Sequence, residues 1–138
     1  MLLAWIVCVA VTRPCTGLTR YVCPVTCQCD RLLQSVTCVN YPHDVIPTIP
    51  ASTKRFTLSN TQLGSLNSDS FAGKNFQKVS HLVLNYCGIS DIAKDTFTRL
   101  VSLIELHLQG NNLAHGLVFF TFIRHTLFRD RWICHTTN

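Results

Sequence analysis

Apolar residues recur with the same spacing three times between residues 53 and 113. The three segments read TKRFTLSNTQL, VSHLVLNYCGI and LIELHLQGNNL, and their central leucines are Leu58, Leu84 and Leu108. These leucines stand 26 and 24 residues apart, within the period of roughly 20 to 29 residues that a short solenoid repeat has. The pattern therefore predicts three stacked copies of one structural unit.

Each copy is predicted to be a short strand followed by an inward turn. Leu82 and Leu84 are two positions apart, so in an extended chain both point to one face while Val83 points to the other. The next apolar residue, Ile89, follows five positions after Leu84. That step fits neither strand nor helix periodicity. The backbone after each strand is therefore expected to be irregular.

A turn buried beneath the strands needs hydrogen-bond partners for its backbone N–H and C=O groups. The position expected to supply them holds Thr61, Cys87 and Asn111 in the three copies. Asparagine offers two donors and an acceptor, whereas threonine and cysteine can make fewer such bonds. One repeat cannot bury its own apolar face, so stacking of the copies is what builds a core.

Phenylalanines strengthen this interpretation. Phe71 and Phe97 each stand thirteen residues after a central leucine. The alternative is a mixed domain of ordinary strands and helices, in which the leucine spacing and the phenylalanine spacing would both be coincidences. Two independent matches argue against that alternative.

Residues 1–17 have the character of a signal peptide. The apolar run MLLAWIVCVAV is followed by the polar segment TRPCTG, and cleavage could follow Ala10 or Gly17. The run is too short to span a bilayer. The alternatives are an uncleaved anchor and a buried first helix. We expect a secreted, extracellular protein.

Secretion changes how the eight cysteines are interpreted, because an oxidising compartment favours disulfides over metal sites. Cys23, Cys27, Cys29 and Cys38 cluster in the segment CPVTCQCDRLLQSVTC. Four thiolates could instead hold zinc, but a leader sequence and an adjoining repeat array argue against a metal site. Four cysteines allow three pairings, and their spacing alone selects none of them.

The cysteine cluster, the segment VIPTIP and the repeats together resemble the amino-terminal half of an extracellular leucine-rich repeat protein. Toll-type receptors, Slit-like guidance proteins, matrix proteoglycans and lamprey variable lymphocyte receptors share this arrangement. The resemblance implies an α/β-class leucine-rich repeat solenoid with short parallel strands and an irregular convex side. It also implies about two and a half repeats in residues 53–113, and an amino-terminal cap in residues 18–52. The cap disulfides would pair Cys23 with Cys29 and Cys27 with Cys38.

In such proteins the strands line a concave face whose outward residues contact ligand. The corresponding positions in this chain are Arg55, Thr57, Ser59, Asn60, His81, Val83, Asn85, Tyr86, Glu105, His107 and Gln109. Tyr86 is the expected anchor, because tyrosine supplies a large contact area at low entropic cost. The alternative is that these residues are only solvated strand positions.

The chain carries no nucleophile motif, phosphate-binding loop or His-x-x-x-His pair, so we expect no enzyme, cofactor or metal. His81 and His107, with Glu105 nearby, are candidates for a metal site or an acid–base pair. They also suggest a hypothesis, that ligand binding shifts near endosomal pH. The net charge of +5 is small and scattered, which does not favour nucleic acid as a partner.

The repeat frame stops after Leu113, and residues 114–138 are expected to be a divergent tail without a carboxyl-terminal cap. Cys134 is the single cysteine there, and it could cross-link two chains. The tail has no apolar stretch long enough to span a membrane. The segment 117–123 could cover the leucines of the third repeat or form an aggregation-prone window. That edge stays exposed unless the tail folds over it.

The function predicted from these features is protein–protein recognition through the concave face, in a secreted or receptor-derived leucine-rich repeat module. A structural component of the extracellular matrix or of adhesion, which self-associates through its uncapped edge, is the alternative. A truncated product without independent function would show the same sequence pattern.

Overall fold

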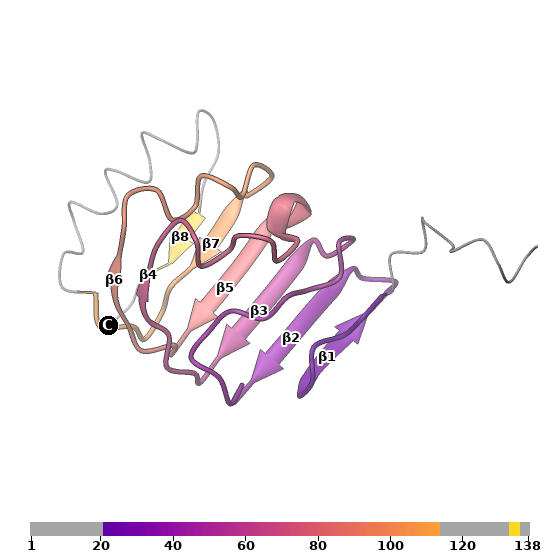
Figure 1. Ribbon diagram of the computed structural model, residues 1–138, viewed down its shortest axis with the longest axis horizontal. Coiled ribbons are helices and arrows are strands. Elements are labelled where there is room, and N and C mark those ends of the chain that lie inside the picture. Colours follow the sequence, from indigo (N-terminus) through magenta and orange to yellow (C-terminus); the bar gives the residue numbers. More distant parts are fainter. Residues whose placement is uncertain (1–20, 114–132, 136–138) are drawn as a thin grey trace, which may run out of the picture.

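The computed structural model describes residues 21–113 and the backbone of residues 133–135. Figure 1 shows a coiled chain in which strands of successive coils lie side by side. They form a sheet in the order β1-β2-β3-β5-β7-β8. Its strands are β1 Cys27–Asp30, β2 Ser35–Val39, β3 Arg55–Ser59, β5 His81–Asn85, β7 Glu105–His107 and β8 Ile133–His135.

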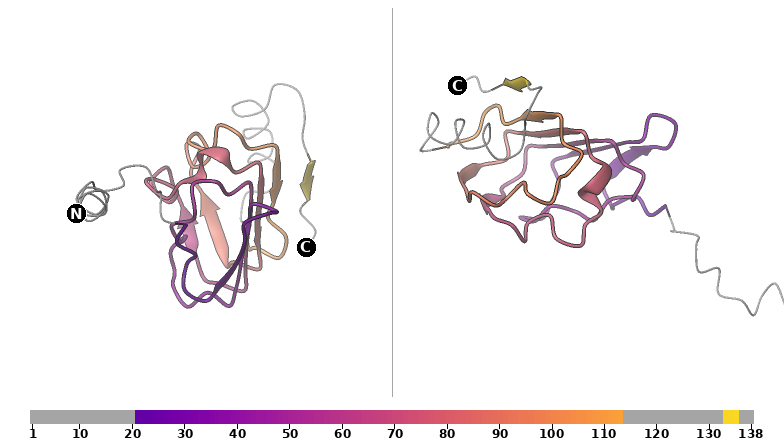
Figure 2. Two further views of the ribbon diagram at one scale, coloured as in Figure 1. Left: turned by 90° about the vertical axis from the view of Figure 1, so that its right-hand side faces the viewer. Right: turned by 90° about the horizontal axis from the view of Figure 1, so that it is seen from above.

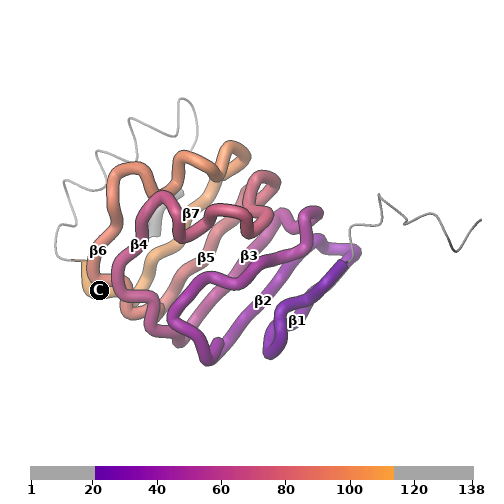
Figure 3. Tube along the Cα trace, viewed as in Figure 1, coloured from indigo at the N-terminus to yellow at the C-terminus, as the bar shows by residue number. Residues whose placement is uncertain are grey.

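The repeats stack in register from β2 to β8, and all these neighbouring strands are parallel. Leu58 aligns with Leu84, and Leu82 aligns with Leu106. After each strand the chain returns along the opposite side of the coil, as the tube in Figure 3 shows. The predicted leucine-rich repeat solenoid with short parallel strands is confirmed.

The core lies between the sheet and these returning segments, which the two views of Figure 2 show from further directions. The three central leucines of the repeats are buried, and a fully buried leucine contributes roughly 1.5 to 3 kcal/mol. The ring of Phe76 meets those of Phe56 and Phe71 edge-on, with centroids 5.1 and 5.0 Å apart. Phe71 and Phe97 are also buried, with ring centroids 5.8 Å apart. The repeated phenylalanines are therefore core residues.

The turn beneath the strands has the hydrogen bonds that its position requires. Asn111 Nδ2 donates to the Leu84 carbonyl at 2.7 Å and to the Leu108 carbonyl at 3.0 Å. Its Oδ1 accepts from the N–H groups of Cys87 and Ile89 at 3.0 and 3.1 Å. Asn111 thus joins the third coil to the second.

The earlier coils have weaker versions of this link, as the residue types predict. The Cys87 thiol donates to the Leu58 carbonyl at 3.2 Å, and the Thr61 hydroxyl donates to the Tyr41 carbonyl at 3.3 Å. Where no asparagine is present, backbone carbonyls replace its side-chain oxygen. The N–H of Leu63, for example, donates to the Cys87 carbonyl at 2.8 Å.

The convex side is more regular than the sequence analysis expected. Here β4 Gly64–Leu66 and β6 Ile89–Ile92 form a two-stranded parallel sheet, and the 3-10 turn η1 spans Phe76–Lys78. Stacking places equivalent segments of neighbouring coils at the same height, so extended backbone there can pair. Apart from η1, the convex side is elsewhere irregular within residues 21–113, as predicted, and these two short strands are an addition to it.

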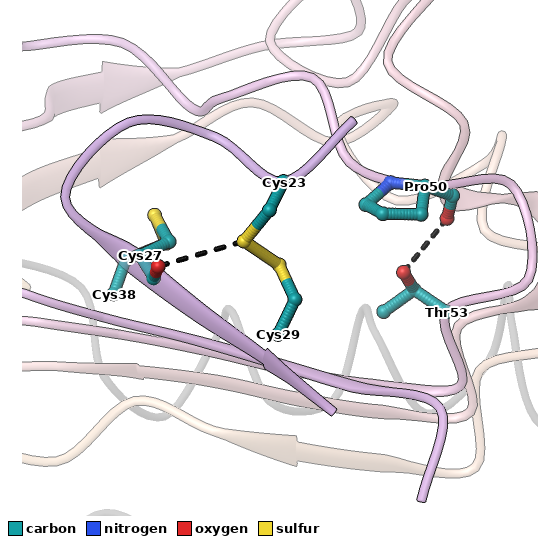
Figure 4. The surroundings of a disulfide bond; sticks show 6 residues. All are labelled: Cys23, Cys27, Cys29, Cys38, Pro50 and Thr53. Carbon is teal, nitrogen blue, oxygen red and sulfur yellow. Dashed lines mark hydrogen bonds between the residues drawn. A yellow bond between two sulfur atoms is a disulfide. The ribbon is translucent and has the colours of Figure 1, made fainter. Parts of the chain in front are cut away.

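The amino-terminal cap is a hairpin in which β1 pairs antiparallel with β2. Disulfides join Cys23 to Cys29 (Figure 4) and Cys27 to Cys38, which is the pairing that the resemblance implied. The hairpin covers the edge of β2. Val36 of β2 aligns with Phe56 of the next strand and is buried like it. A covered edge cannot template pairing with another chain along β2.

A buried threonine links the cap to the first repeat. Thr53 stands where later repeats have Val79 and Leu103, and all three are buried. Its hydroxyl donates to the Pro50 carbonyl at 2.7 Å (Figure 4). The hydrogen bond makes a polar residue tolerable at a core position.

The tail adds strand β8 beside β7, with Cys134 aligned with Leu106. A strand from the tail therefore extends the edge that the third repeat would otherwise leave open. The predicted signal peptide, residues 1–17, and the apolar segment 117–123 lie outside the described residues. The predicted domain boundaries remain expectations.

Candidate functional site

The outward residues of β3, β5 and β7 form rows across the main sheet because the strand registers align them. The rows are Arg55, His81 and Glu105; Thr57, Val83 and His107; and Ser59 and Asn85. Their side chains are half-buried or exposed, whereas the residues between them along each strand are buried. The structure thus brings these predicted positions together on one face.

The other three predicted positions follow the carboxyl ends of the strands. Asn60 follows β3, Tyr86 follows β5, and Gln109 lies two residues beyond β7. Tyr86 is 61% exposed. The Tyr86 N–H donates to the Gln109 carbonyl at 2.8 Å, so the backbones of the two coils are joined at this end of the face.

A carboxylate lies between two imidazoles at the start of the strands. Glu105 Oε2 is 3.3 Å from His81 Nε2, and its other oxygen contacts His107 Nε2. His81 Nδ1 is 2.8 Å from the Ser80 hydroxyl. The proximity inferred from sequence is therefore present. Over residues 21–113 and 133–135, no group of three or more histidine, cysteine or acidic residues is placed to hold a metal ion.

One backbone conformation recurs at equivalent positions beyond β2, β3, β5 and β7. Asn40, Asn60, Tyr86 and Gly110 have φ values of +53°, +55°, +55° and +67°. This left-handed conformation suits glycine and asparagine and is uncommon for a bulky residue. Tyr86 is therefore the outlier in an otherwise ordinary series.

Two side chains lie across glycines of the next coil. A Cβ atom at Gly110 would come within 2.3 Å of Tyr86 Cδ1 and Cε1, and one at Gly88 within 2.1 Å of Gln62 Oε1. Any other residue at these glycines would have to displace the side chain above it. Gln62, Gly88 and Gly110 could not be predicted from the sequence, because these contacts join different repeats.

Charge is unevenly distributed over this region. Lys54, Arg55 and Glu105 lie at the start of the strands, whereas residues 59–66, 85–90 and 108–113 contain no charged side chain. We call the uncharged residues at and beyond the strand ends the neutral rim. Its members are Asn60, Gln62, Asn85, Tyr86, Gln109 and Asn112.

Away from the sequence-predicted positions, a pocket of about 230 Å³ lies among residues of the returning segments. Phe71 and Phe76 line it together with Gly73, Gln77 and Arg99. Both phenylalanines are buried core residues, so the pocket adjoins the core. None of the predicted site residues reaches it.

A buried thiol accompanies the turn beneath the rim. Burial raises the pKa of Cys87 to about 11, and the backbone hydrogen bond from Thr61 opposes this shift. A thiol with so high a pKa is protonated at neutral pH and is a poor nucleophile. Cys87 therefore belongs to the core and to the turn.

Comparison with known proteins identifies the repeats. Residues 51–113 match the family model described as leucine rich repeat. The chain is 32% identical over 90 residues to epiphycan of Gallus gallus, covering 65% of this chain and 28% of that protein. It is 30% identical over 95 residues to trophoblast glycoprotein of Macaca fascicularis, covering 67% and 23%.

One further relative and one solved structure are also leucine-rich repeat matches to this chain. Toll-like receptor 3 of Homo sapiens is 29% identical over 82 residues, covering 59% of this chain and 9% of the receptor. The crystal structure of human trophoblast glycoprotein superposes with a TM-score of 0.63 at 31% identity, covering 70% of this chain and 35% of that one. The chain thus spans less than a third of the length of these three curated relatives.

The comparisons confirm the resemblance to extracellular leucine-rich repeat proteins and the fold that it implied. The relatives are secreted proteins or proteins of the extracellular matrix and of receptors, so the predicted extracellular location is supported as well. Among the described residues, no helix has the length and apolar character that crossing a bilayer requires.

Proposed function

From a chain whose residues 51–113 match the leucine-rich repeat family, we propose a secreted or receptor-derived module that recognises a protein through its concave face. The alternation in β3, β5 and β7 carries this proposal. Every second residue is buried in the core, and the residues between them present one continuous mixed polar surface. One scaffold thus supplies rigidity and a contact surface at once.

The two ends of this face suit different parts of a protein interface. Arg55 and Glu105 at the strand starts offer both signs of charge, which orients a partner and favours complementary side chains. Tyr86 at the strand ends offers an exposed aromatic ring, the residue type that most often anchors an interface. No catalytic role is proposed, since the relatives are receptors and matrix proteins.

A binding screen tests the proposal. The full chain is applied to an array of extracellular protein domains, and each partner found is tested against variants. Tyr86→Ala and Arg55→Ala are expected to weaken binding by about tenfold or more, the scale of an interface anchor. Lys78→Ala, on an exposed residue at the end of η1, is the control and should bind normally. Equal binding by all three variants would contradict recognition through the concave face.

The alternative function is structural. A component of matrix or adhesion assemblies would self-associate, and its association would depend on residues 114–138. The strand β8, which the tail adds to the edge of the sheet, is the observation that keeps this alternative open. A truncated product without independent function would neither bind a partner nor assemble.

A further inference from the structure

Tyr86 is a residue type that the recurring left-handed turn does not favour. Its φ of +55° places a bulky side chain where the other coils have asparagine or glycine. A bulky residue in this conformation is strained, and strained residues of this kind cluster at functional sites. Packing offsets little of this strain, because 61% of the residue remains exposed. The conformation instead presents the ring at the surface.

The ring lies over the backbone of Gly110. Its Cδ1 and Cε1 atoms occupy the space that a side chain at residue 110 would fill, and only glycine leaves that space open. Gln62 lies over Gly88 in the same way, one coil earlier. A side chain fixed before binding loses less entropy on binding. Gly110 therefore acts as a positioning residue for Tyr86.

The side chains around the ring have unused hydrogen-bonding groups. Asn85 Oδ1 accepts from the Gln109 N–H at 2.9 Å. Within the described residues, the side chains of Asn60, Gln62, Gln109 and Asn112 form no hydrogen bond or ion pair. Each primary amide offers two donors and an acceptor. The neutral rim is thus rich in donors and acceptors and carries no charge.

This chemistry matches one class of ligand. A sugar hydroxyl both donates and accepts hydrogen bonds, as the amides do, and the C–H groups of a pyranose pack against an aromatic ring. An acidic or basic ligand would find no opposite charge at the rim. The pocket of the returning segments, where an apolar ligand could insert, is lined by residues outside the rim.

We propose that the neutral rim binds an uncharged saccharide, with Tyr86 packing against a pyranose ring and the amides bonding its hydroxyls. The inference rests on the proposed function in one respect: the sugar would be carried by the protein that the strand rows recognise.

A glycan array tests the inference with the full chain. Neutral oligosaccharides form one arm, and sialylated and sulfated oligosaccharides form another. Binding is expected in the neutral arm. Tyr86→Asn should weaken it by about tenfold or more while leaving thermal stability unchanged or higher, because asparagine tolerates the left-handed conformation.

Two glycine variants form a matched pair. Gly110→Ala should also weaken binding by displacing the ring, whereas Gly73→Ala should not. Gly73 has the same left-handed backbone, with φ +68°, and nothing lies within 4 Å of the added Cβ, so it controls for backbone strain alone. The inference is overturned by binding to acidic glycans only, by binding to no glycan, or by neutral binding that Tyr86→Asn leaves intact. If no saccharide binds but the chain still binds a protein of the array, the saccharide inference fails and the proposed protein recognition does not.

Discussion

Replacing Asn111 by alanine is expected to destabilise the chain more than its partial burial suggests. The side chain makes two donor bonds, to Leu84 and Leu108, and accepts two bonds from the N–H groups of Cys87 and Ile89. Each such bond contributes a net ~0.5 to 1.5 kcal/mol, and a buried partner left unsatisfied costs more. The free energy of unfolding is therefore expected to fall by about 3 to 5 kcal/mol.

That loss is a large part of the roughly 5 to 15 kcal/mol that holds a small domain folded. The thermal midpoint should fall by ~10 °C or more. Chemical denaturation followed by circular dichroism measures the free energy of unfolding directly. Asn112→Ala is the matched control: its side chain is exposed and makes no such bonds, so a change below about 0.5 kcal/mol is expected.

The same position one coil earlier provides a graded comparison. Cys87→Ala removes a single weak thiol donor to the Leu58 carbonyl, so its cost should be smaller than that of Asn111→Ala. If Asn111→Ala unfolds within about 1 kcal/mol of the unmodified chain, the side chain does not join the coils as described. A larger loss for Cys87→Ala than for Asn111→Ala would be equally damaging.

Three further outcomes are expected. Removing the disulfide between Cys27 and Cys38 by a double serine substitution should cost about 2 to 4 kcal/mol, seen as a lower midpoint in thermal unfolding; an unchanged midpoint would mean that the cap does not stabilise the array. Phe76→Ala should cost about 3 to 5 kcal/mol, because two phenylalanine rings lose their edge-on partner, and urea denaturation would reveal a smaller loss if the ring were dispensable. Burial raises the pKa of Cys87 from 9.0 to about 11, so the stability that the protonated thiol contributes is complete below pH 9.0 and is lost as pH rises toward 11. Peptide mapping after alkylation at pH 8 should find this thiol unmodified unless urea is added. Rapid modification of the native chain would refute its burial.

The repeat spacing was sufficient to predict the main sheet. Apolar residues two apart can face one side only in an extended chain, so Leu82 and Leu84 fixed the strand and its buried face. The step of five residues to Ile89 predicted the turn, and the special place of Asn111 followed from its bonding capacity. The cap disulfides were different, since spacing left three pairings open and only the resemblance to a family chose between them.

Features that depend on contacts between coils could not be predicted in the same way. The β4 and β6 segments are too short to show alternation, and they pair only because stacking brings them level. The contact of Tyr86 with Gly110 joins residues of different repeats, although the left-handed series of Asn40, Asn60 and Gly110 shows residue types that tolerate positive φ. Strand β8 could not be predicted from the repeat pattern, because that pattern ends at Leu113, before the strand begins.

This fold is compatible with recognition by a single chain and with assembly of many chains. The mass of the particle that the full chain forms in solution distinguishes the two functions most directly. Size-exclusion chromatography with light scattering, with and without reductant, gives that mass. The account predicts one chain per particle in both conditions, with the concave face free to meet a partner. A dimer or larger particle that dissociates when residues 114–138 are removed would contradict it and favour the structural alternative.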